Sequence, residues 1–410
     1  MTSGGTLLRV LQALDPAPAR RPPPAAARAA TAPPSTTHAG PPPAELGSWC
    51  DALVADATEM ARNLRVQLVD AECEAVLWTP AAWEVPCDLR MDPSTGDEGA
   101  AAHQGGAGLP PFYCSWRPAA SDALSTDGRS PAIIRTPGYS SGFVPPSAAL
   151  SQAGYAQFHV NPLGLGTPAG NDLSKRQPIS EPVKARLQAD SIGGAYANLD
   201  EGVPPHLMRT ARGVAGGYRD WLVCGVAAVL WLARHCPAID PLRLGMAGGS
   251  QGGGASLLLA SLLQGTPPAV HCAGLTVRAV AADQPFMTNW PMMLEVGDQR
   301  HPAMAELAHV MEQRRSDGPA ELEKAWAALG LVDTVSHAHR LTGLPTLLTA
   351  GGEDGTCPFP CVQVRSHGLQ LHSLWRIPTA ATSQHVSVRP GAVRAVGGGE
   401  GIRGGAWARA

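Results

Sequence analysis

The chain has 410 residues and a formal charge of −3, and 44% of its residues are hydrophobic. That length and hydrophobic content suit one large α/β domain or two ordinary ones with a sizeable buried core. The near-neutral charge argues against a nucleic-acid-binding face, and no apolar run approaches the roughly 18 residues that a membrane-spanning helix needs.

Two segments of biased composition flank the central part of the chain. Residues 1–48 are rich in Pro, Ala and Arg, and residues 396–410 are rich in Gly and Arg. Neither composition can bury enough apolar surface to offset the entropy of ordering. We therefore expect a disordered tail at each end and one α/β domain over residues 49–395.

The cysteines indicate the compartment. The nine cysteines are scattered, and none forms a C-x-x-C pair or a His/Cys cluster with zinc-finger spacing. Free buried thiols in a reducing compartment are the simpler interpretation, with a regulatory disulfide between Cys357 and Cys361 as the alternative. The sequence also lacks a basic start followed by an apolar run, so we expect a cytoplasmic protein rather than a secreted one.

The expected secondary-structure elements alternate along the chain, most clearly after residue 128. A helix running into a strand is expected over residues 49–70. Strands are expected over 130–139, 155–166, 242–248, 275–286, 345–354 and 373–380, and helices over 208–236 and 253–264. This alternation predicts a mostly parallel sheet with helices on both faces. In such a sheet, sites form at the edge where the strand ends cluster.

Two serines stand in a G-x-S-x-G pattern, which sets a nucleophile on a tight turn between a strand and a helix. Ser250 follows the strand 242–248 and precedes a leucine-rich helical segment without proline, which is the context that this turn needs. Ser140 also follows a strand, but Pro145 and Pro146 come next and disfavour an immediate helix. Ser250 is therefore the predicted nucleophile and Ser140 a turn residue. A glycine-rich turn without chemistry is the alternative.

A serine nucleophile needs a histidine to take its proton and an acid to orient that histidine. In folds that carry the serine on a turn of this kind, the chain order is Ser, acid, His. Asp354 follows an apolar strand beside glycines and is the predicted acid, with Asp283 as second choice. Of the later histidines, His367 and His372 lie in a segment typical of a helix leading to a strand. His385 follows the last expected strand in a loop and is the predicted base.

Acyl transfer also needs donors for the oxyanion that develops on the substrate carbonyl. One is the backbone N–H of Gln251, the residue after the serine, at the start of a helix whose N-terminus stabilises negative charge. The other comes from the loop after an earlier strand, which here is TPGYSS, residues 136–141. The backbone N–H of Tyr139 is the predicted second donor.

Four segments together resemble the acetyl xylan esterase/cephalosporin C deacetylase family of α/β-hydrolases. They are TPGYSS (136–141), GGSQGG (248–253), AVAADQPF (279–286) and GGEDGTCPFP (351–360). YRDW at 218–221 also fits, and the resemblance covers residues 130–385. It implies an α/β-hydrolase fold and the deacetylation of small acetylated compounds, carbohydrate esters among them, through an acyl-serine intermediate.

The resemblance also implies roles for individual residues. Ser250, Asp354 and His385 would be the catalytic triad, with Tyr139 and Gln251 as oxyanion donors. No cofactor and no metal are expected, and the expected partner is a small acetylated substrate rather than a nucleic acid or a membrane. A homo-oligomer, a hexamer by family analogy, is expected. A peptidase or lipase of the same fold and a non-catalytic α/β-hydrolase-fold binding protein stay open as alternatives.

Overall fold

The structure is a computed structural model of the whole chain. It describes residues 41–69, 83, 86–93, 109, 111–120, 128–138, 147–161, 205–214, 216–265, 274–298, 300–351, 354–368 and 373–377. Almost all of the two expected tails lies outside these residues. Helix α2 (Pro43–Asn63) begins within the last residues of the expected N-terminal tail.

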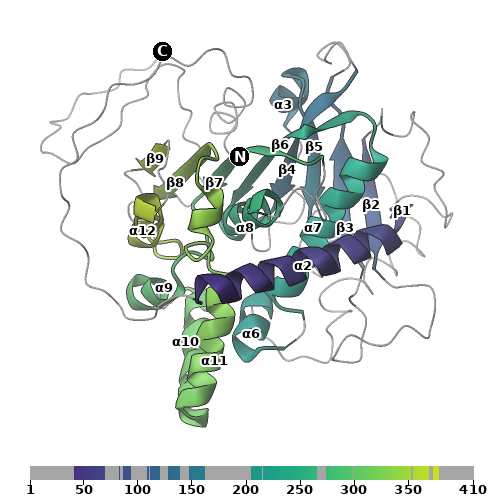
Figure 1. Cartoon of the computed structure of the whole chain (residues 1–410). Helices are drawn as coiled ribbons and strands as arrows, with labels where there is room; N and C mark the ends of the chain where they lie inside the picture. The colour runs from purple at the N-terminus through teal and green to yellow at the C-terminus, as the bar shows by residue number, and fades with distance from the viewer. Residues whose placement is uncertain are drawn as a thin grey trace, which may run out of the picture.

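Nine strands in the described part of the chain form one sheet, in the order β1-β2-β3-β5-β4-β6-β7-β8-β9 (Figure 1). Their bounds are β1 Arg65–Leu68, β2 Cys87–Asp92, β3 Phe112–Arg117, β4 Ser130–Thr136, β5 Ala156–Val160, β6 Ile239–Gly249, β7 Val277–Asp283, β8 Thr346–Gly351 and β9 Ser373–Ile377. Neighbours from β5 to β9 pair in parallel, whereas β1, β2, β3 and β5 pair antiparallel. The predicted mostly parallel sheet is confirmed.

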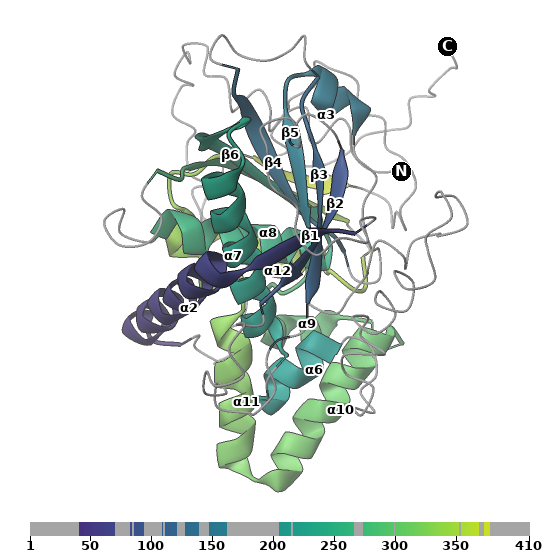
Figure 2. The ribbon, with the colours of Figure 1, turned by 90° about the vertical axis from the view of Figure 1, so that its right-hand side faces the viewer.

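Helices lie on both faces of this sheet, as predicted. Their bounds are α3 Ala148–Gln152, α6 Pro205–Arg212, α7 Tyr218–His235, α8 Gln251–Gly265, α9 Trp290–Val296, α10 Pro302–Asp317, α11 Pro319–Leu331 and α12 Phe359–Gly368, with a short 3-10 helix η5 at Ala338–Leu341. Helices α2, α7 and α8 cover one face and share the main core with it (Figures 1 and 2). On the other face, Leu150 of α3 packs against Ile133, Ala247 and Ala279. None of the described helices combines the length and the hydropathy needed to cross a membrane.

The prediction of a single long helix over residues 208–236 is wrong, because the chain forms two helices there, α6 and α7. Gly213 and Gly216 have φ of 69° and 83°, in the left-handed region that glycine adopts without steric cost. Gly213 and Val214 donate their N–H groups back to the carbonyls of Thr210 and Arg209, which ends α6. The apolar stretch begins a second helix only at Tyr218.

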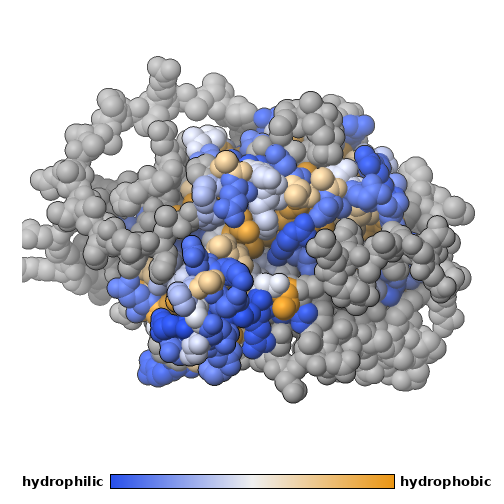
Figure 3. Space-filling view, turned by 60° about the horizontal axis from the view of Figure 1, so that its bottom comes forward, coloured by the Kyte–Doolittle hydropathy of each residue, from blue (hydrophilic) through white to orange (hydrophobic). Residues whose placement is uncertain are grey.

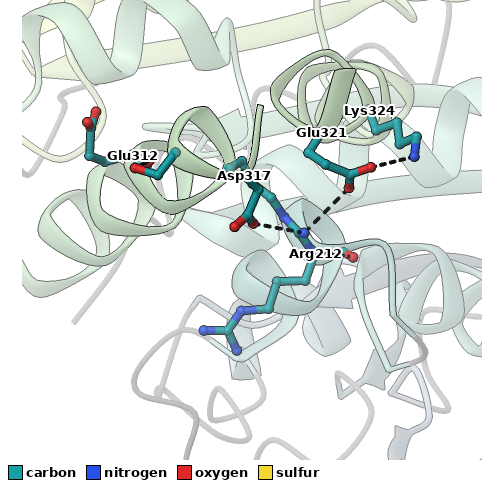
Figure 4. Close-up of polar contacts among 7 residues, drawn as sticks. Arg212, Glu312, Asp317, Glu321 and Lys324 are labelled. Carbon is teal, nitrogen blue, oxygen red and sulfur yellow. Dashed lines mark hydrogen bonds and ion pairs between the residues drawn. The ribbon is translucent and has the colours of Figure 1, made fainter. Parts of the chain in front are cut away.

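Helices α10 and α11 form a hairpin that projects from the body of the protein, in a part of the chain for which the sequence suggested no helix (Figure 2). The exposed residues around its turn are mostly hydrophilic (Figure 3). Arg314 donates to the carbonyl of Arg212 at the end of α6, at 3.0 Å. Its guanidinium also pairs with the carboxylates of Asp317 and Glu321, each at 3.6 Å (Figure 4). The hairpin is therefore linked to α6, near its turn, through one arginine.

Candidate active site

Ser250 lies on the turn between β6 and α8, as predicted. Its φ is 53°, a left-handed conformation that is uncommon for a residue with a side chain and that occurs at strained functional turns. Its N–H donates to the carbonyl of Asp283 at 2.8 Å, and its carbonyl accepts from the N–H of Phe286 at 2.9 Å and of Gly254 at 3.1 Å. Backbone hydrogen bonds therefore hold both peptide groups of the predicted nucleophile.

The glycines around Ser250 are required by close backbone contacts. A Cβ atom at Gly252 would lie 2.6 Å from the carbonyl oxygen of Pro137, and one at Gly248 would lie 2.7 Å from that of Thr136. The Thr136 hydroxyl also donates to the Gly252 carbonyl at 2.6 Å. The start of the loop after β4, where the second oxyanion donor is predicted, thus packs directly against the nucleophile turn.

Gln251 is the first residue of α8 and is fully buried. The first N–H groups of an α-helix have no acceptor in a preceding turn, so the backbone N–H of Gln251 is placed to donate outside the helix. Its side-chain Oε1 accepts a hydrogen bond from the Tyr218 hydroxyl at 3.2 Å. The structure thus adds Tyr218 to the neighbours of the predicted oxyanion donor.

Two carboxylates follow neighbouring strands at this edge of the sheet. Asp354, after β8, accepts the N–H groups of Thr356 and Cys357, both at 2.8 Å. Asp283, the last residue of β7, accepts a hydrogen bond from the Thr349 hydroxyl. Burial raises the pKa of Asp283; the Thr349 bond opposes this rise, and the charge of Asp354 adds to it. The predicted acid and its second choice therefore lie close enough to interact electrostatically.

Cys357 connects the predicted nucleophile with the predicted acid. Burial raises the pKa of its thiol well above the usual value, the charge of Asp354 adds to the rise, and a hydrogen bond with the Ser250 side chain opposes it. The thiol is therefore a neighbour of both Ser250 and Asp354. Cys357 and Cys361 are free thiols, so the disulfide alternative is not what the structure contains.

The loop between β7 and α9 is a part of the site that the sequence did not reveal. Three of its residues have left-handed backbones, Gln284 (φ 47°), Met287 (φ 64°) and Asn289 (φ 58°). The Asp333 carboxylate accepts the N–H of Asn289 at 2.8 Å and of Trp290 at 2.9 Å, which fixes the end of this loop. The same loop supplies the Phe286 N–H that binds the carbonyl of Ser250.

Two predicted site residues, Tyr139 and His385, lie outside the described part of the chain, as do Ser140 and His372. His367 lies near the end of α12. The base and the second oxyanion donor thus stay predictions. No three His, Cys, Asp or Glu side chains within the described ranges are grouped so as to hold a metal ion.

The strand order, the strained serine turn after β6 and the helix that begins at Gln251 define an α/β-hydrolase fold, as the sequence predicted. The structure is similar to that of acetyl xylan esterase 1 from Thermoanaerobacterium sp. JW/SL YS485, with a TM-score of 0.57, 18% identity and coverage of 85% of this chain and 92% of that one. It is also similar to an acetyl xylan esterase from Paenibacillus sp. R4, with a TM-score of 0.52, 17% identity and coverage of 85% and 95%. At these identities the likeness establishes the fold.

The sequence also matches a family model over part of its length. Residues 217–367 match the model of the acetyl xylan esterase (AXE1) family. The match includes the nucleophile turn, the β7–α9 loop and Asp354. A comparison with curated proteins finds no match to this sequence. The resemblance expected from the sequence motifs is therefore confirmed over residues 217–367.

Proposed function

We propose that this protein is a serine esterase that hydrolyses acetyl esters of small molecules or carbohydrates through an acyl-serine intermediate. The observation that carries the proposal is the left-handed backbone of Ser250 on the turn between β6 and α8. Such a turn projects the serine hydroxyl from the sheet edge and places the N-terminus of a helix behind it. The AXE1 match over residues 217–367 supports the ester as substrate.

In the proposed reaction the Ser250 hydroxyl oxygen attacks the acetyl carbonyl while His385 takes its proton. Asp354 orients the imidazole and stabilises its positive charge. The backbone N–H groups of Gln251 and Tyr139 donate to the oxyanion of the tetrahedral intermediate. His385 then gives the proton to the leaving alcohol, and a water molecule that it activates hydrolyses the acetyl-serine to acetate.

A fluorophosphonate probe tests the nucleophile on the full chain, independently of the acyl group. We expect mass spectrometry to locate the adduct on Ser250 and His385→Ala to abolish labelling. The adduct should stay on Ser250 in Ser140→Ala, which removes the serine of the other G-x-S-x-G match. A folded wild-type protein that takes no probe at Ser250 would overturn the proposal and favour the non-catalytic alternative.

The acyl group is tested by comparing p-nitrophenyl acetate, butyrate and octanoate with a peptidyl substrate. We expect kcat/KM to be highest for acetate, since an acetyl-specific pocket penalises longer acyl groups. A preference for octanoate would favour a lipase, and a preference for the peptidyl substrate a peptidase.

A further inference from the structure

An aromatic cluster lies next to the start of α8, on the face of the sheet that α2, α7 and α8 cover. It is centred on Tyr218, which is fully buried. The Tyr218 ring lies 5.9 Å from Trp221, 6.0 Å from His206 and 6.4 Å from Trp290, measured between ring centroids. These four rings come from α6, α7 and α9, so the cluster joins three helices at one point.

The polar end of Tyr218 reaches from this cluster to the oxyanion side of the site. Its hydroxyl donates to Gln251 Oε1 at 3.2 Å. The Gln251 side chain is fully buried, and its Nε2 finds no partner among the residues that the structure describes. Within that part of the chain, the bond from Tyr218 is therefore the polar contact that orients the Gln251 amide.

Contacts between the end of α6 and the start of α7 hold Tyr218 in place. Its backbone N–H donates to the Thr210 hydroxyl at 2.8 Å, and that hydroxyl donates to the His206 carbonyl at 2.7 Å. A Cβ at Gly217 would lie 2.7 Å from the Thr210 hydroxyl oxygen, so only glycine lets α7 begin this close to α6. The break between α6 and α7 thus fixes where the Tyr218 ring and its hydroxyl lie.

We propose that Tyr218 is a positioning residue for the oxyanion donor Gln251, an inference that rests on the proposed esterase function. Gln251 is the first residue of α8, and its N–H shares a peptide group with the Ser250 carbonyl, which accepts from Phe286 and Gly254. The bond from Tyr218 to the side-chain amide restrains the Gln251 Cα on the other side of that peptide group, so the two restraints together hold the direction of the backbone N–H. An oxyanion donor is effective only when it already points at the position where charge develops.

The same cluster also supports Ser250, the residue that precedes Gln251 in the turn. Phe286 packs edge-to-face on Trp290, with ring centroids 5.3 Å apart, and its N–H donates to the carbonyl of Ser250. Trp290 stacks on Tyr218. The predicted nucleophile and the predicted oxyanion donor are thus both linked to one aromatic cluster, Ser250 through Phe286 and Gln251 through Tyr218.

The test is Tyr218→Phe in the full chain, which removes one hydroxyl and keeps the ring. With p-nitrophenyl acetate we expect kcat to fall about tenfold or more at unchanged KM, because a misaligned oxyanion donor weakens transition-state binding. The second-order rate of fluorophosphonate labelling should fall with it. Tyr155→Phe, at another buried tyrosine that belongs to the opposite face of the sheet, should leave both rates unchanged.

Gln251→Met supplies the second half of the test, because it keeps the backbone N–H and removes the acceptor of the Tyr218 hydroxyl. We expect the same loss of kcat, and no further loss in the double variant, since both changes cut one link. Should Tyr218→Phe fail to fold, the kcat and KM of Gln251→Met decide the inference alone.

Two results would overturn the inference. One is a folded Tyr218→Phe with wild-type kcat, and the other is losses that multiply in the double variant. Both are distinct from failure of the proposed function, in which the wild-type protein itself neither hydrolyses the ester nor takes the probe at Ser250.

Discussion

The N–H of Ser250 donates a 2.8 Å hydrogen bond to the carbonyl of Asp283, the last residue of the neighbouring strand β7. Three residues further on, the N–H of Phe286 donates to the carbonyl of Ser250 at 2.9 Å. A single loop therefore holds the serine from both of its peptide groups. This arrangement explains how a residue with an unfavourable φ keeps one conformation, because two backbone hydrogen bonds oppose its relaxation.

The left-handed backbone of Ser250 predicts an unusual order of stabilities among its variants. A left-handed conformation costs an L-residue roughly 1–2 kcal/mol, whereas glycine adopts it freely. We expect Ser250→Gly to have a free energy of unfolding about 1 kcal/mol higher than Ser250→Ala, measured by urea denaturation. At Ser256, inside α8, the order should reverse, because alanine is about 1 kcal/mol better than glycine in a helix interior. The same order at both positions would contradict the prediction.

Gly252 and Gly47 form a matched pair of glycine-to-alanine tests. A Cβ at Gly252 would lie 2.6 Å from the Pro137 carbonyl oxygen, whereas one at Gly47 in α2 meets no atom within 4 Å. We expect Gly252→Ala to lower the free energy of unfolding by about 2 kcal/mol or more, as overpacking does. Gly47→Ala should raise it by about 0.5–1 kcal/mol through helix propensity. Thermal unfolding of both variants checks the pair, and equal melting temperatures would count against the packing argument.

Substitution of the two carboxylates separately identifies the acid of the triad. We expect Asp354→Asn to lower kcat for p-nitrophenyl acetate by about 10⁴-fold, as loss of the triad acid does in a serine protease. Asp283→Asn should have a much smaller effect, because its carboxylate accepts from Thr349 and its backbone carbonyl, which binds Ser250, is unchanged. Steady-state kinetics of both variants decide the assignment. A larger loss in Asp283→Asn would reverse it.

The buried Asp283 carboxyl also predicts a dependence of stability on pH. Burial raises its pKa above 3.8, so the native protein binds this proton more tightly than the unfolded chain does. The stability that the group contributes is complete below pH 3.8 and is lost as pH rises through the higher native pKa. Asp283→Asn removes this loss.

We therefore expect the free energy of unfolding of Asp283→Asn to increase relative to that of the wild type as the pH rises from about 4 to 7. Urea denaturation of both proteins at several pH values measures the difference. A difference between variant and wild type that stays constant over this range would contradict the assigned pKa direction.

The sequence predicted those parts of the fold that depend on neighbouring residues. The strand β6, the turn at Ser250 and the helix α8 form one continuous segment, so apolar spacing and glycine content were sufficient to place them. The strand β2 was missed because charged residues interrupt it. Asp88 and Arg90 of β2 make ion pairs with Arg117 and Asp92, and these pairs conceal the apolar pattern. Strand β3 also went unassigned.

The supports of the site could not be predicted for a different reason. Tyr218 and Gln251 are 33 positions apart, and Asn289 and Asp333 are 44 apart. Nothing in the local composition links such residues, because their contact depends on how α6, α7 and α9 pack. Ser250 and Asp354, in contrast, were indicated by the residues beside them, because each follows an apolar strand and is flanked by glycines. Asp354 was preferred to Asp283 as the acid because of the glycines beside Asp354.

The order of strands has a consequence for the synthesis of this protein. Strand β4 lies between β5 and β6, and the Ser130 hydroxyl donates to the carbonyl of Ala238, 108 positions later. On the ribosome, one edge of β4 therefore stays unpaired while the following hundred or so residues are translated, and open strand edges favour aggregation. Because Ser250 follows directly on β6, the event that closes this edge also forms the nucleophile turn. A nascent chain released before that point would be aggregation-prone and inactive together.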